Sequence, residues 1–360
     1  MSSLGVLEEN QVVFPKLGLD IEISDTAFTI AGLEIKWYGI FITVGLLLAV
    51  IYAFKNMKSY GIDPDRAIDV IIGGVLGGLV GARAYYVLLN WDSYSGDIAS
   101  IFNIRNGGLA IYGGIIGAVL VAAIVAKFKK VKLLPLLDIA GVGFLLGQGI
   151  GRWGNFTNQE AFGCNTETLF GMSSGKIQQW IAQYGNTATL PAGEVLEVSK
   201  PVHPCFLYES VWCLLGFVVL AILAKKIRKF DGQIFLMYAA WYGLGRFFIE
   251  GLRIDSLMIG SLRVSQGLAA VCFVASVVLL IVFSLKVRRM GDDYKLYCDT
   301  KESKALLNES EENTDNESKD ITSENEETTD DTEESKDSAE INNTVQERKE
   351  NTDTENKEEN

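Results

Sequence analysis

Long apolar runs alternate with short polar connections through the first 290 residues of the chain. Seven of these runs approach the ~20 helical residues that are needed to cross a bilayer. They span 37–54, 67–89, 108–126, 134–150, 206–224, 233–250 and 264–285. A soluble protein could bury one or two such runs but not seven, so the pattern predicts an all-α membrane bundle of seven transmembrane helices.

Lysine and arginine residues gather in every second connection between the runs. The first, third and fifth connections and the end of the last run carry them, while the even-numbered connections and the N-terminus are poorer in positive charge. The residues are Lys55, Lys58, Arg66, Lys127, Lys129, Lys130, Lys132, Lys225, Lys226, Arg228, Lys229, Lys286, Arg288 and Arg289. Because cytoplasmic loops are enriched in Lys and Arg, we expect the N-terminus outside and the C-terminus in the cytoplasm.

Polar stretches divide the chain into three parts. Residues 1–36 alternate apolar and acidic positions, which suits an extracytoplasmic segment that forms a short hairpin or lies on the outer surface. Residues 37–290 form the helical domain, and the long polar loop 155–204 within it predicts a small extracytoplasmic cap. Residues 291–360 contain 25 acidic and 8 basic residues, whereas the rest of the chain carries a net charge of +4. With almost no aromatic residues, this last part is expected to be a disordered acidic cytoplasmic tail.

Small residues recur at helical spacing inside the runs. Gly73, Gly77 and Gly81 are four residues apart, as are Gly143 and Gly147. Glycine at every fourth position lets helices pack closely in lipid, so we interpret these ladders as packing surfaces. The five cysteines are far apart without a CxxC pattern, which favours small buried side chains over a disulfide framework.

Several charged side chains lie inside or beside the apolar runs, where a charge costs several kcal/mol unless it is paired or faces a cavity. Arg83 lies near the outer end of the second run, and Arg152 follows the fourth. Arg246 and Glu250 lie in the sixth run, and Arg253 follows it. Under the predicted topology all of them approach the outer leaflet, which makes them candidates for function.

The sixth run carries a polar stripe. Tyr238, Tyr242, Arg246 and Glu250 are each four residues apart and therefore line one helix face. An Arg246–Glu250 pair that only neutralises itself is one interpretation. Two arginines facing one cavity, the other being Arg152, instead suggest an anionic partner, because the planar guanidinium donates two hydrogen bonds to a phosphate at once.

The only histidine, His203, begins the segment "HPCFLYES" just before the fifth run. A single histidine is more often structural than catalytic, but its position at the same outer rim as Arg152 and Arg246 favours a role in the site. From the residues alone, a lipid-modifying enzyme and a transporter of an anionic lipid or small anion both fit. A transporter would be expected to contain inverted repeats. The two halves of this chain show no convincing repeat of that kind.

The segment "GRWGNFTNQEAFG", Gly151–Gly163, closely resembles the signature G-R-x-G-N-F-x-N-x-E-x-x-G of the prolipoprotein diacylglyceryl transferases. Three further segments support the resemblance in the same order along the chain. They are "WYG" at Trp37–Gly39, "HPCFLYE" at His203–Glu209 and "YGLGRFFIEGLR" at Tyr242–Arg253. The resemblance covers about residues 30–285 and leaves out the acidic tail.

The resemblance implies an enzyme of the bacterial cytoplasmic membrane whose site faces the outer leaflet. Members of the family transfer the sn-1,2-diacylglyceryl group of phosphatidylglycerol to the lipobox cysteine in the signal peptide of a prolipoprotein. A thioether forms and glycerol-1-phosphate leaves, which is the first step of lipoprotein maturation. The implied partners are phosphatidylglycerol and prolipoproteins, and no metal, diffusible cofactor or nucleic acid is implied. An anionic-lipid or small-anion transporter stays as the alternative.

The matched motifs also imply roles for single residues. Arg152 would bind the headgroup of phosphatidylglycerol, and Asn155 and Glu160 would shape the site around it. Arg246 would be the second phosphate clamp. Gly163 would permit a tight turn at the mouth of the site.

Further matched residues would complete the cavity. Tyr38, Tyr242 and Glu250 would line it or relay protons, and Arg253 would extend the binding face. His203 joins them as a candidate catalytic residue.

The sequence departs from the family pattern at Tyr112. Many members have histidine at the start of the third-run motif H-G-G-x-x-G, where this chain reads "YGGIIG". Tyr112 is therefore a candidate catalytic residue that could act as the base in place of this histidine, although an unperturbed tyrosine, with a pKa of about 10, is a poor base at neutral pH. Glu160, Glu250, His203 or the leaving phosphate itself could accept the thiol proton instead, and the sequence leaves these alternatives open.

Overall fold

The computed structural model describes residues 4–96, 98–104, 107–185, 195–259 and 262–312. The chain divides into two compact units, Met1–Ser303 and Lys304–Asn360. In the second unit, residues 304–312 are helical. The predicted disorder of the acidic tail falls mostly on residues 313–360, which lie outside the described residues. The first unit extends to Ser303, past the predicted end of the helical domain at residue 290.

The first unit is mostly helical, and among its described residues six helices are long and apolar enough to cross a membrane. The main helices are α1 (Trp37–Met57), α2 (Pro64–Leu89), α5 (Ile111–Phe128), α6 (Leu133–Asn158), α8 (Cys205–Lys226), α9 (Gln233–Leu252) and α10 (Val264–Met290). Each corresponds to one predicted run. These six helices do not include α9. Its 20 residues are less apolar than a typical span because they include tyrosine, tryptophan, glycine, arginine and glutamate.

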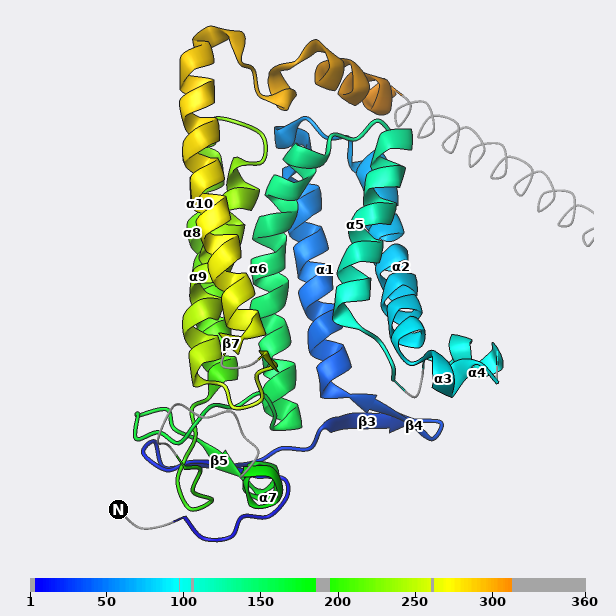
Figure 1. The fold of residues 1–360 in the computed structure, drawn as a ribbon. Helices are drawn as coiled ribbons and strands as arrows, with labels where there is room; N and C mark the ends of the chain where they lie inside the picture. The colour runs from blue at the N-terminus through cyan, green and yellow to red at the C-terminus, as the bar shows by residue number, and fades with distance from the viewer. Residues whose placement is uncertain (1–3, 97, 105–106, 186–194, 260–261, 313–360) are drawn as a thin grey trace, which may run out of the picture. The chain divides into compact units, whose positions relative to one another are not determined.

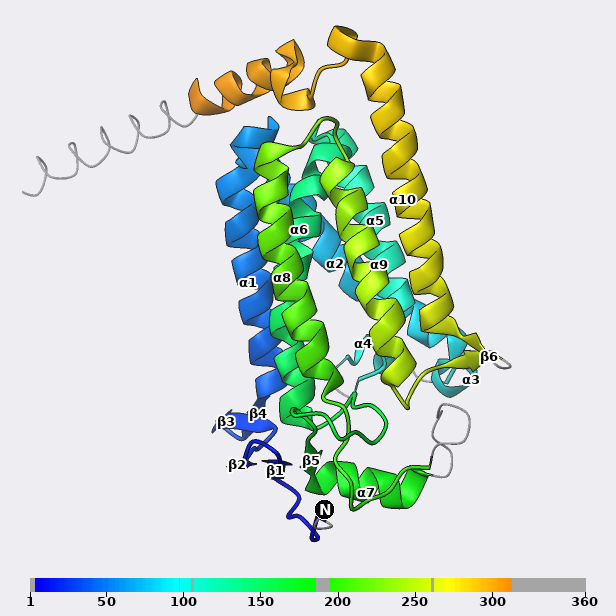
Figure 2. The same cartoon turned by 90° about the vertical axis from the view of Figure 1, so that its left-hand side faces the viewer.

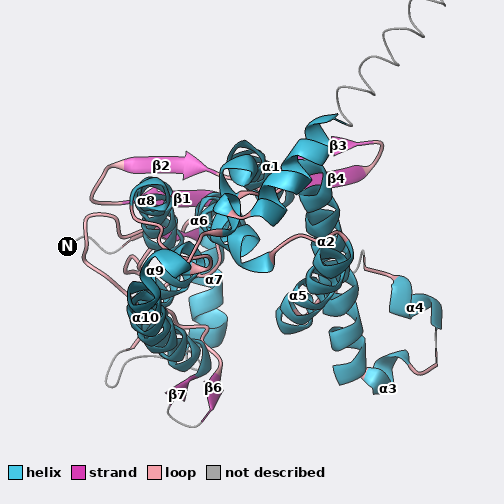
Figure 3. Ribbon diagram, turned by 90° about the horizontal axis from the view of Figure 1, so that it is seen from above, coloured by secondary structure: helices cyan, strands magenta, loops and turns pink. Residues whose placement is uncertain are grey.

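The helices pack in an order that differs from their order in the chain. Antiparallel α2 and α5 pack along each other, α1 packs on α6, and α6 also contacts α8 and α9. Helix α10 packs against α9. Seen from above, α2 and α5 lie on one side of α1 and α6, and α8, α9 and α10 lie on the other (Figure 3).

Close approach of backbones explains the predicted glycine ladders. A Cβ atom on Gly81 would overlap the backbone of Gly113 and Gly117 on the facing helix, and a Cβ on Gly45 would lie 3.0 Å from the carbonyl oxygen of Gly147. Helices α2 and α5, and likewise α1 and α6, can therefore approach this closely only because glycine lacks a side chain.

Two tryptophans fix the register between α8 and α9. Trp212 Nε1 donates to the carbonyl oxygen of Trp241 at 2.9 Å, and Trp241 Nε1 donates to that of Trp212 at 3.0 Å. The two rings stack with centroids 4.5 Å apart. Each indole lies against a glycine of the other helix, Gly245 or Gly216. This reciprocal pairing fixes the heights of Glu209 on α8 and Arg246 on α9 relative to each other.

A buried acid anchors the beginning of α9. Asp138, on the first turns of α6 and fully buried, accepts hydrogen bonds from the backbone N–H groups of Gly232 and Phe235, both at 2.9 Å. The same carboxylate lies 3.8 Å from the Nε atom of Arg228. Because the first N–H groups of a helix have no intrahelical partner, Asp138 supplies what the start of α9 lacks.

Short strands and one amphipathic helix form a small domain at the end of the bundle where α6 and α9 finish, which we call the site end (Figures 1 and 2). Strand β1 (Gln11–Phe14) pairs with β2 (Leu19–Glu22) and with β5 (Ser173–Ser174), and α7 (Gly175–Tyr184) follows β5. Two hairpins, β3 (Thr26–Ile30) with β4 (Leu33–Lys36) and β6 (Met258–Ile259) with β7 (Leu262–Arg263), lie at the same end.

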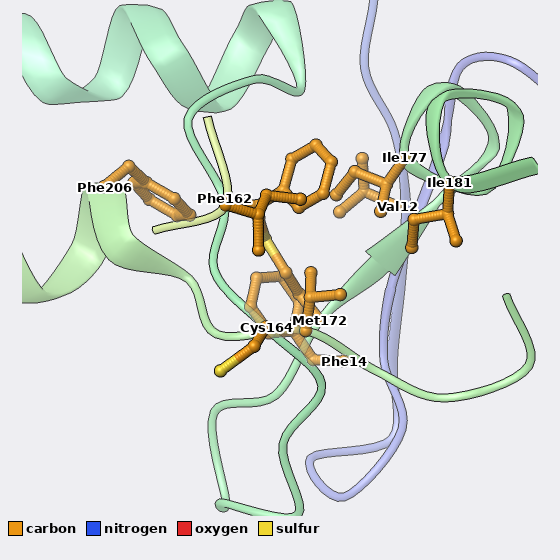
Figure 4. Close-up of a cluster of buried hydrophobic side chains, with 10 residues drawn as sticks. Val12, Phe14, Phe162, Cys164, Met172, Ile177, Ile181 and Phe206 are labelled. Carbon is orange, nitrogen blue, oxygen red and sulfur yellow. The ribbon is translucent and has the colours of Figure 1, made fainter. Parts of the chain in front are cut away.

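The core of this small domain joins the N-terminal segment to the loop between α6 and α8. Val12 and Phe14 of β1 pack with Phe162, Met172 and Ile177, as Figure 4 shows. The N-terminal segment therefore forms hairpins, one of the two forms expected for it. The remaining short elements at this end are α3 (Trp91–Tyr94) and α4 (Ile98–Phe102).

At the opposite end of the bundle, short 3-10 turns connect to the long helices. Turn η1 (Lys58–Tyr60) follows α1, and η3 (Gly291–Asp293) and η4 (Tyr297–Asp299) follow α10.

Candidate active site

Glu209 lies at the centre of the charged groups at the site end. It follows Pro204 by one turn of α8, and its side chain is only 4% exposed. Oε2 lies 2.5 Å from Arg152 Nη2, and Oε1 accepts a hydrogen bond from Arg246 Nη1 at 2.6 Å. Arg253 Nη1 lies 3.9 Å from Oε1. Helices α6 and α9, and the residue after α9, thus meet on one carboxylate of α8.

The polar stripe of α9 takes the predicted form. Arg246 Nη2 lies 2.5 Å from Glu250 Oε2, one helical turn away, so the expected internal pair exists. Arg246 nevertheless uses its other terminal nitrogen for Glu209, so neutralising Glu250 is not its only contact. Tyr242 stacks on Tyr238 with ring centroids 6.1 Å apart.

Arg152 begins a chain of hydrogen bonds that leads to the end of α6. Its Nη1 donates to Asn155 Oδ1 at 3.3 Å, and Asn155 Nδ2 donates to Glu160 Oε1 at 2.9 Å. Asn158 Nδ2 donates to the same oxygen at 3.2 Å. Glu160 is exposed, whereas Arg152 is mostly buried. The motif therefore connects the buried carboxylate cluster with a carboxylate at the surface.

Arg253 lies between the carboxylates of Glu209 and Asp255. Its Nε and Nη2 donate to the two oxygens of Asp255 at 2.9 and 2.7 Å. Burial opposes the charge of this guanidinium most strongly, but the hydrogen bonds of Asp255 and the negative charges of Asp255, Glu209 and Glu250 together outweigh burial and raise the pKa of Arg253 above its ordinary value. Arg263 Nη1 donates to the carbonyl oxygens of Glu250 and Arg253, which holds the end of α9 in place.

Gly163 is required for a different reason from the predicted tight turn. The turn after α6 uses Gln159 and Ala161, whose φ angles are both +57°. Gly163 instead lies where three segments meet: its N–H donates to the carbonyl of His203 at 2.9 Å, and a Cβ atom there would lie 2.8 Å from His203 Cβ and 2.9 Å from the carbonyl oxygen of Leu252. Close approach, not backbone conformation, excludes a side chain.

His203 lies beside this junction but points to another partner. Its Nδ1 is 3.1 Å from the hydroxyl of Tyr208, which lies 3.4 Å from Thr168 Oγ1. The backbone N–H of His203 donates to the carbonyl of Cys164 at 3.0 Å. These contacts place the imidazole next to Tyr208, one residue before Glu209.

The two remaining predicted tyrosines lie in different places. Tyr38, in the first turn of α1, packs its ring against Gly154 of α6, between Arg152 and Asn155. Tyr112 lies in the first turn of α5 and is 46% exposed. Helix α5 packs along α2, on the far side of α1 and α6 from α9 (Figure 3). The structure therefore brings Tyr38 to the site end of α6 and does not join Tyr112 to the arginine cluster.

Arg83 shows a different solution for an arginine in a membrane helix. Its guanidinium donates to four carbonyl oxygens of the connection between α2 and α5, those of Ile101, Ser100, Gly107 and Gly108, at 2.7 to 3.0 Å. Four of the five N–H donors of Arg83 thus bind backbone carbonyls, which ties its side chain to that connection.

Glu209 is the central residue that the sequence analysis did not select. The signal was present, because Glu209 is the acidic residue within the apolar run 206–224, and the cost of a charge in a membrane span applies to it as it does to Glu250. Among the described residues, no group of three or more His, Cys, Asp and Glu has an arrangement that could hold a metal ion.

Comparison with known proteins gives consistent matches over the helical part of the chain. The sequence model described as prolipoprotein diacylglyceryl transferase matches residues 25–282. A phosphatidylglycerol–prolipoprotein diacylglyceryl transferase of Finegoldia magna is 43% identical over 261 residues, which cover 72% of this chain and 96% of that protein. Proteins of the same name are 40% identical in Clostridioides difficile and 38% in Listeria monocytogenes, covering 72% and 74% of this chain and 95% and 91% of theirs.

Proposed function

Because this chain belongs to the prolipoprotein diacylglyceryl transferase family, we propose that it transfers the sn-1,2-diacylglyceryl group of phosphatidylglycerol to the lipobox cysteine of prolipoproteins. It is a transferase of lipoprotein biosynthesis. The observation that carries the site assignment is the meeting of Arg152 and Arg246 on the buried carboxylate of Glu209.

The reaction needs stabilisation of charge on a leaving phosphate. The cysteine sulfur forms a bond to the sn-3 carbon of the diacylglyceryl group, the bond between that carbon and the phosphate oxygen breaks, and the electron pair leaves with glycerol-1-phosphate. The thiol loses its proton. Because the nucleophile belongs to the protein substrate, the enzyme needs no serine or cysteine of its own. Donors arranged around the developing phosphate charge are the main contribution that it must supply.

Arg152 and Arg246 suit that task. Each guanidinium has five N–H donors, and the contacts with Glu209, Asn155 and Glu250 engage only its two terminal nitrogens. Glu209 holds the two side chains together and thereby keeps two like charges close before the phosphate arrives. In this proposal the phosphate binds to both arginines, with Arg253 nearby.

The residues around the arginines give the site its outline. Asn155 and Glu160 lead from Arg152 to the surface and would contact the glycerol headgroup. Tyr242, beside Arg246 on α9, and Tyr38, against Gly154, would line the cavity. The proposal gives His203 and Gly163 positioning roles, because their described contacts join the segments that carry Arg253 and Glu209.

The burial and the contacts of the candidate side chains reduce the number of possible acceptors for the thiol proton. Glu250 is buried and paired with Arg246, and Tyr112 lies on α5, away from the cluster. Glu160 is an exposed carboxylate connected to Arg152 through Asn155. We therefore favour Glu160 or the leaving phosphate as the proton acceptor.

We further propose that α9 crosses the membrane with the six other long helices, giving seven spans. The proposed topology has the N-terminal segment 1–36 and the loop 155–204 outside and residues 291–360 in the cytoplasm. It rests on the basic residues of the α1–α2, α5–α6 and α8–α9 connections, all at the opposite end of the bundle from Arg152. The substrates would then reach the site from the outer leaflet of the cytoplasmic membrane.

A transfer assay with the purified full-length chain tests the function. Phosphatidylglycerol labelled in its diacylglyceryl group is incubated with a lipobox peptide, and the same peptide with serine in place of cysteine is the control. We expect label linked to the cysteine peptide through a thioether, with an equal amount of glycerol-1-phosphate released. In proteoliposomes, movement of labelled lipid across the bilayer without any thioether would instead support the transporter and overturn this proposal.

A further inference from the structure

The segment that follows α10 crosses the ends of the other helices at the end opposite the site. It comprises residues 291–303, with turns η3 and η4, and it belongs to the same compact unit as the bundle (Figure 1). The family match ends at residue 282, so these contacts are made by a part of the chain outside the matched region.

Its first contact is with the connection that leads into α9. The hydroxyl of Tyr294 accepts a hydrogen bond from the backbone N–H of Asp231 at 3.1 Å, and the carboxylate of Asp231 accepts one from the N–H of Tyr297 at 2.9 Å. The other oxygen of Asp231 accepts from Arg228 at 2.8 Å. Asp231 immediately precedes Gly232, whose N–H is held by Asp138.

Its second contact is with the start of α6. Lys132, the residue before that helix, lies 3.1 Å from a carboxylate oxygen of Glu302 and 5.9 Å from the ring centroid of Tyr297. Tyr297 itself is buried. These contacts add an ion pair and a cation–π interaction, both partly exposed and individually weak.

Its third contact is with the connection between α1 and α2. The hydroxyl of Ser303 donates to the carbonyl oxygen of Gly61 at 2.8 Å, and Ser303 is completely buried. Gly61 has a φ angle of +76°, and a Cβ atom there would overlap Ser303 and the backbone of Cys298. The segment therefore fits against a position where only glycine leaves room for it.

We propose that residues 291–303 act as a strap that closes the bundle at the end opposite the site and fixes the start of α9. The strap joins three connections that are far apart in the sequence to the end of α10. Through Asp231 it restrains the residue next to the first turn of α9, the helix that carries Arg246. The basis is geometric, so the strap stands or falls independently of the proposed transferase reaction.

Hydrogen exchange of the full-length chain in detergent micelles tests the strap. In the wild-type protein, peptides covering 291–303 should exchange far more slowly than a free chain. Tyr294→Phe removes only the hydroxyl that accepts from the N–H of Asp231. Asp231→Ala keeps that N–H but removes the carboxylate, which accepts from Tyr297 and Arg228. We expect exchange in 291–303 and 228–236 to rise about three- to tenfold in Tyr294→Phe, the range given by one lost hydrogen bond, and further in Asp231→Ala.

The matched control is Asp292→Asn, which changes an exposed residue of the same segment. In this variant all peptides should exchange at the wild-type rate. In all three variants, peptides from α2 and α5 should also exchange at the wild-type rate. Free-chain exchange of 291–303 in the wild-type protein would overturn the proposal. So would unchanged exchange of 228–236 in Tyr294→Phe and Asp231→Ala, because the strap would then not restrain α9. Circular dichroism of each variant separates these results from unfolding.

Discussion

Asp138 and Glu209 are both buried acids that contact α9, but they bind it with different partners. Asp138 accepts from two backbone N–H groups at the start of the helix, whose positions are fixed by the main chain. Glu209 binds the ends of two long arginine side chains, Arg246 near the other end of α9 and Arg152 of α6. A backbone amide cannot turn toward a new partner without unwinding the helix, whereas a guanidinium can share its donors with a second anion.

The difference separates a structural joint from a binding site. Arg83 belongs with Asp138 in this respect, because backbone carbonyls bind four of its five donors. Burial and charge alone therefore do not identify function in this bundle. What distinguishes the site end is that several charged side chains meet there with one another rather than with the backbone.

The largest effect is expected from removing a guanidinium at the site end. Arg246→Ala should reduce the rate of diacylglyceryl transfer about 10²- to 10³-fold, the cost typical of losing one donor to a developing oxyanion. Initial rates with labelled phosphatidylglycerol and a lipobox peptide measure it.

The same conservative change at the two ends sharpens this prediction. Arg246→Lys keeps the charge but loses the planar fork, so it should remain well below the wild-type rate. Arg228→Lys, at the opposite end, should transfer at nearly the wild-type rate per folded molecule. Equal rates for these two variants would remove the proposed distinction between the ends.

Glu209→Gln should have the next largest effect on the reaction. The amide keeps the shape of the side chain but offers only one acceptor oxygen to Arg152 and Arg246, which then lose their common alignment. We expect the transfer rate to fall about 10- to 100-fold, as for a misplaced catalytic group. Rate measurements at saturating phosphatidylglycerol test it, and an unchanged rate would show that the carboxylate does not align the arginines.

Asp138→Asn should lower the stability of the fold but leave the rate of the transfer reaction nearly unchanged. Its NH₂ group would face one of the two backbone N–H donors and leave it without an acceptor, which costs about 1–3 kcal/mol. The midpoint of thermal unfolding in detergent should drop, while the transfer rate per folded molecule stays near that of the wild type. A large loss of rate in folded protein would contradict the assignment of Asp138 to a structural joint.

Tyr112→Phe should have the smallest effect. Tyr112 lies on α5, apart from the cluster, and we expect the variant to retain transfer at close to the wild-type rate. The comparison variant is Glu160→Gln, which should be slower if Glu160 accepts the thiol proton. A large fall in the transfer rate of Tyr112→Phe would instead indicate that Tyr112 takes part in proton transfer.

Much of the helical architecture could be predicted, because long apolar runs report burial in lipid directly. The end of α6 could not: the run stops near residue 150, but the helix continues to Asn158. The polar residues in its last turns bond to one another and to Glu209, contacts that hydropathy does not register. The strap was also not predicted. The acidic composition of 291–360 indicated disorder, although Tyr294 and Tyr297 lie near the start of that range.

The candidate site was predictable where motifs marked it and less so where it depends on contacts. The spacing of Tyr238, Tyr242, Arg246 and Glu250 correctly predicted a shared face. Glu209 was missed because its importance comes from three arginines that are distant in the sequence. The reason for Gly163 was wrong, because crowding by His203 and Leu252 becomes apparent only once the chain is folded.

Transfer by the Arg152→Ala variant tests the central claim most directly, since Arg152 connects Glu209 with the motif that leads to the surface. The variant would be purified alongside the wild type, checked for folding by thermal unfolding, and assayed with labelled phosphatidylglycerol and a lipobox peptide. We predict a folded protein that releases almost no glycerol-1-phosphate and forms almost no thioether. Transfer at the wild-type rate would contradict the claim that Arg152 holds the leaving phosphate.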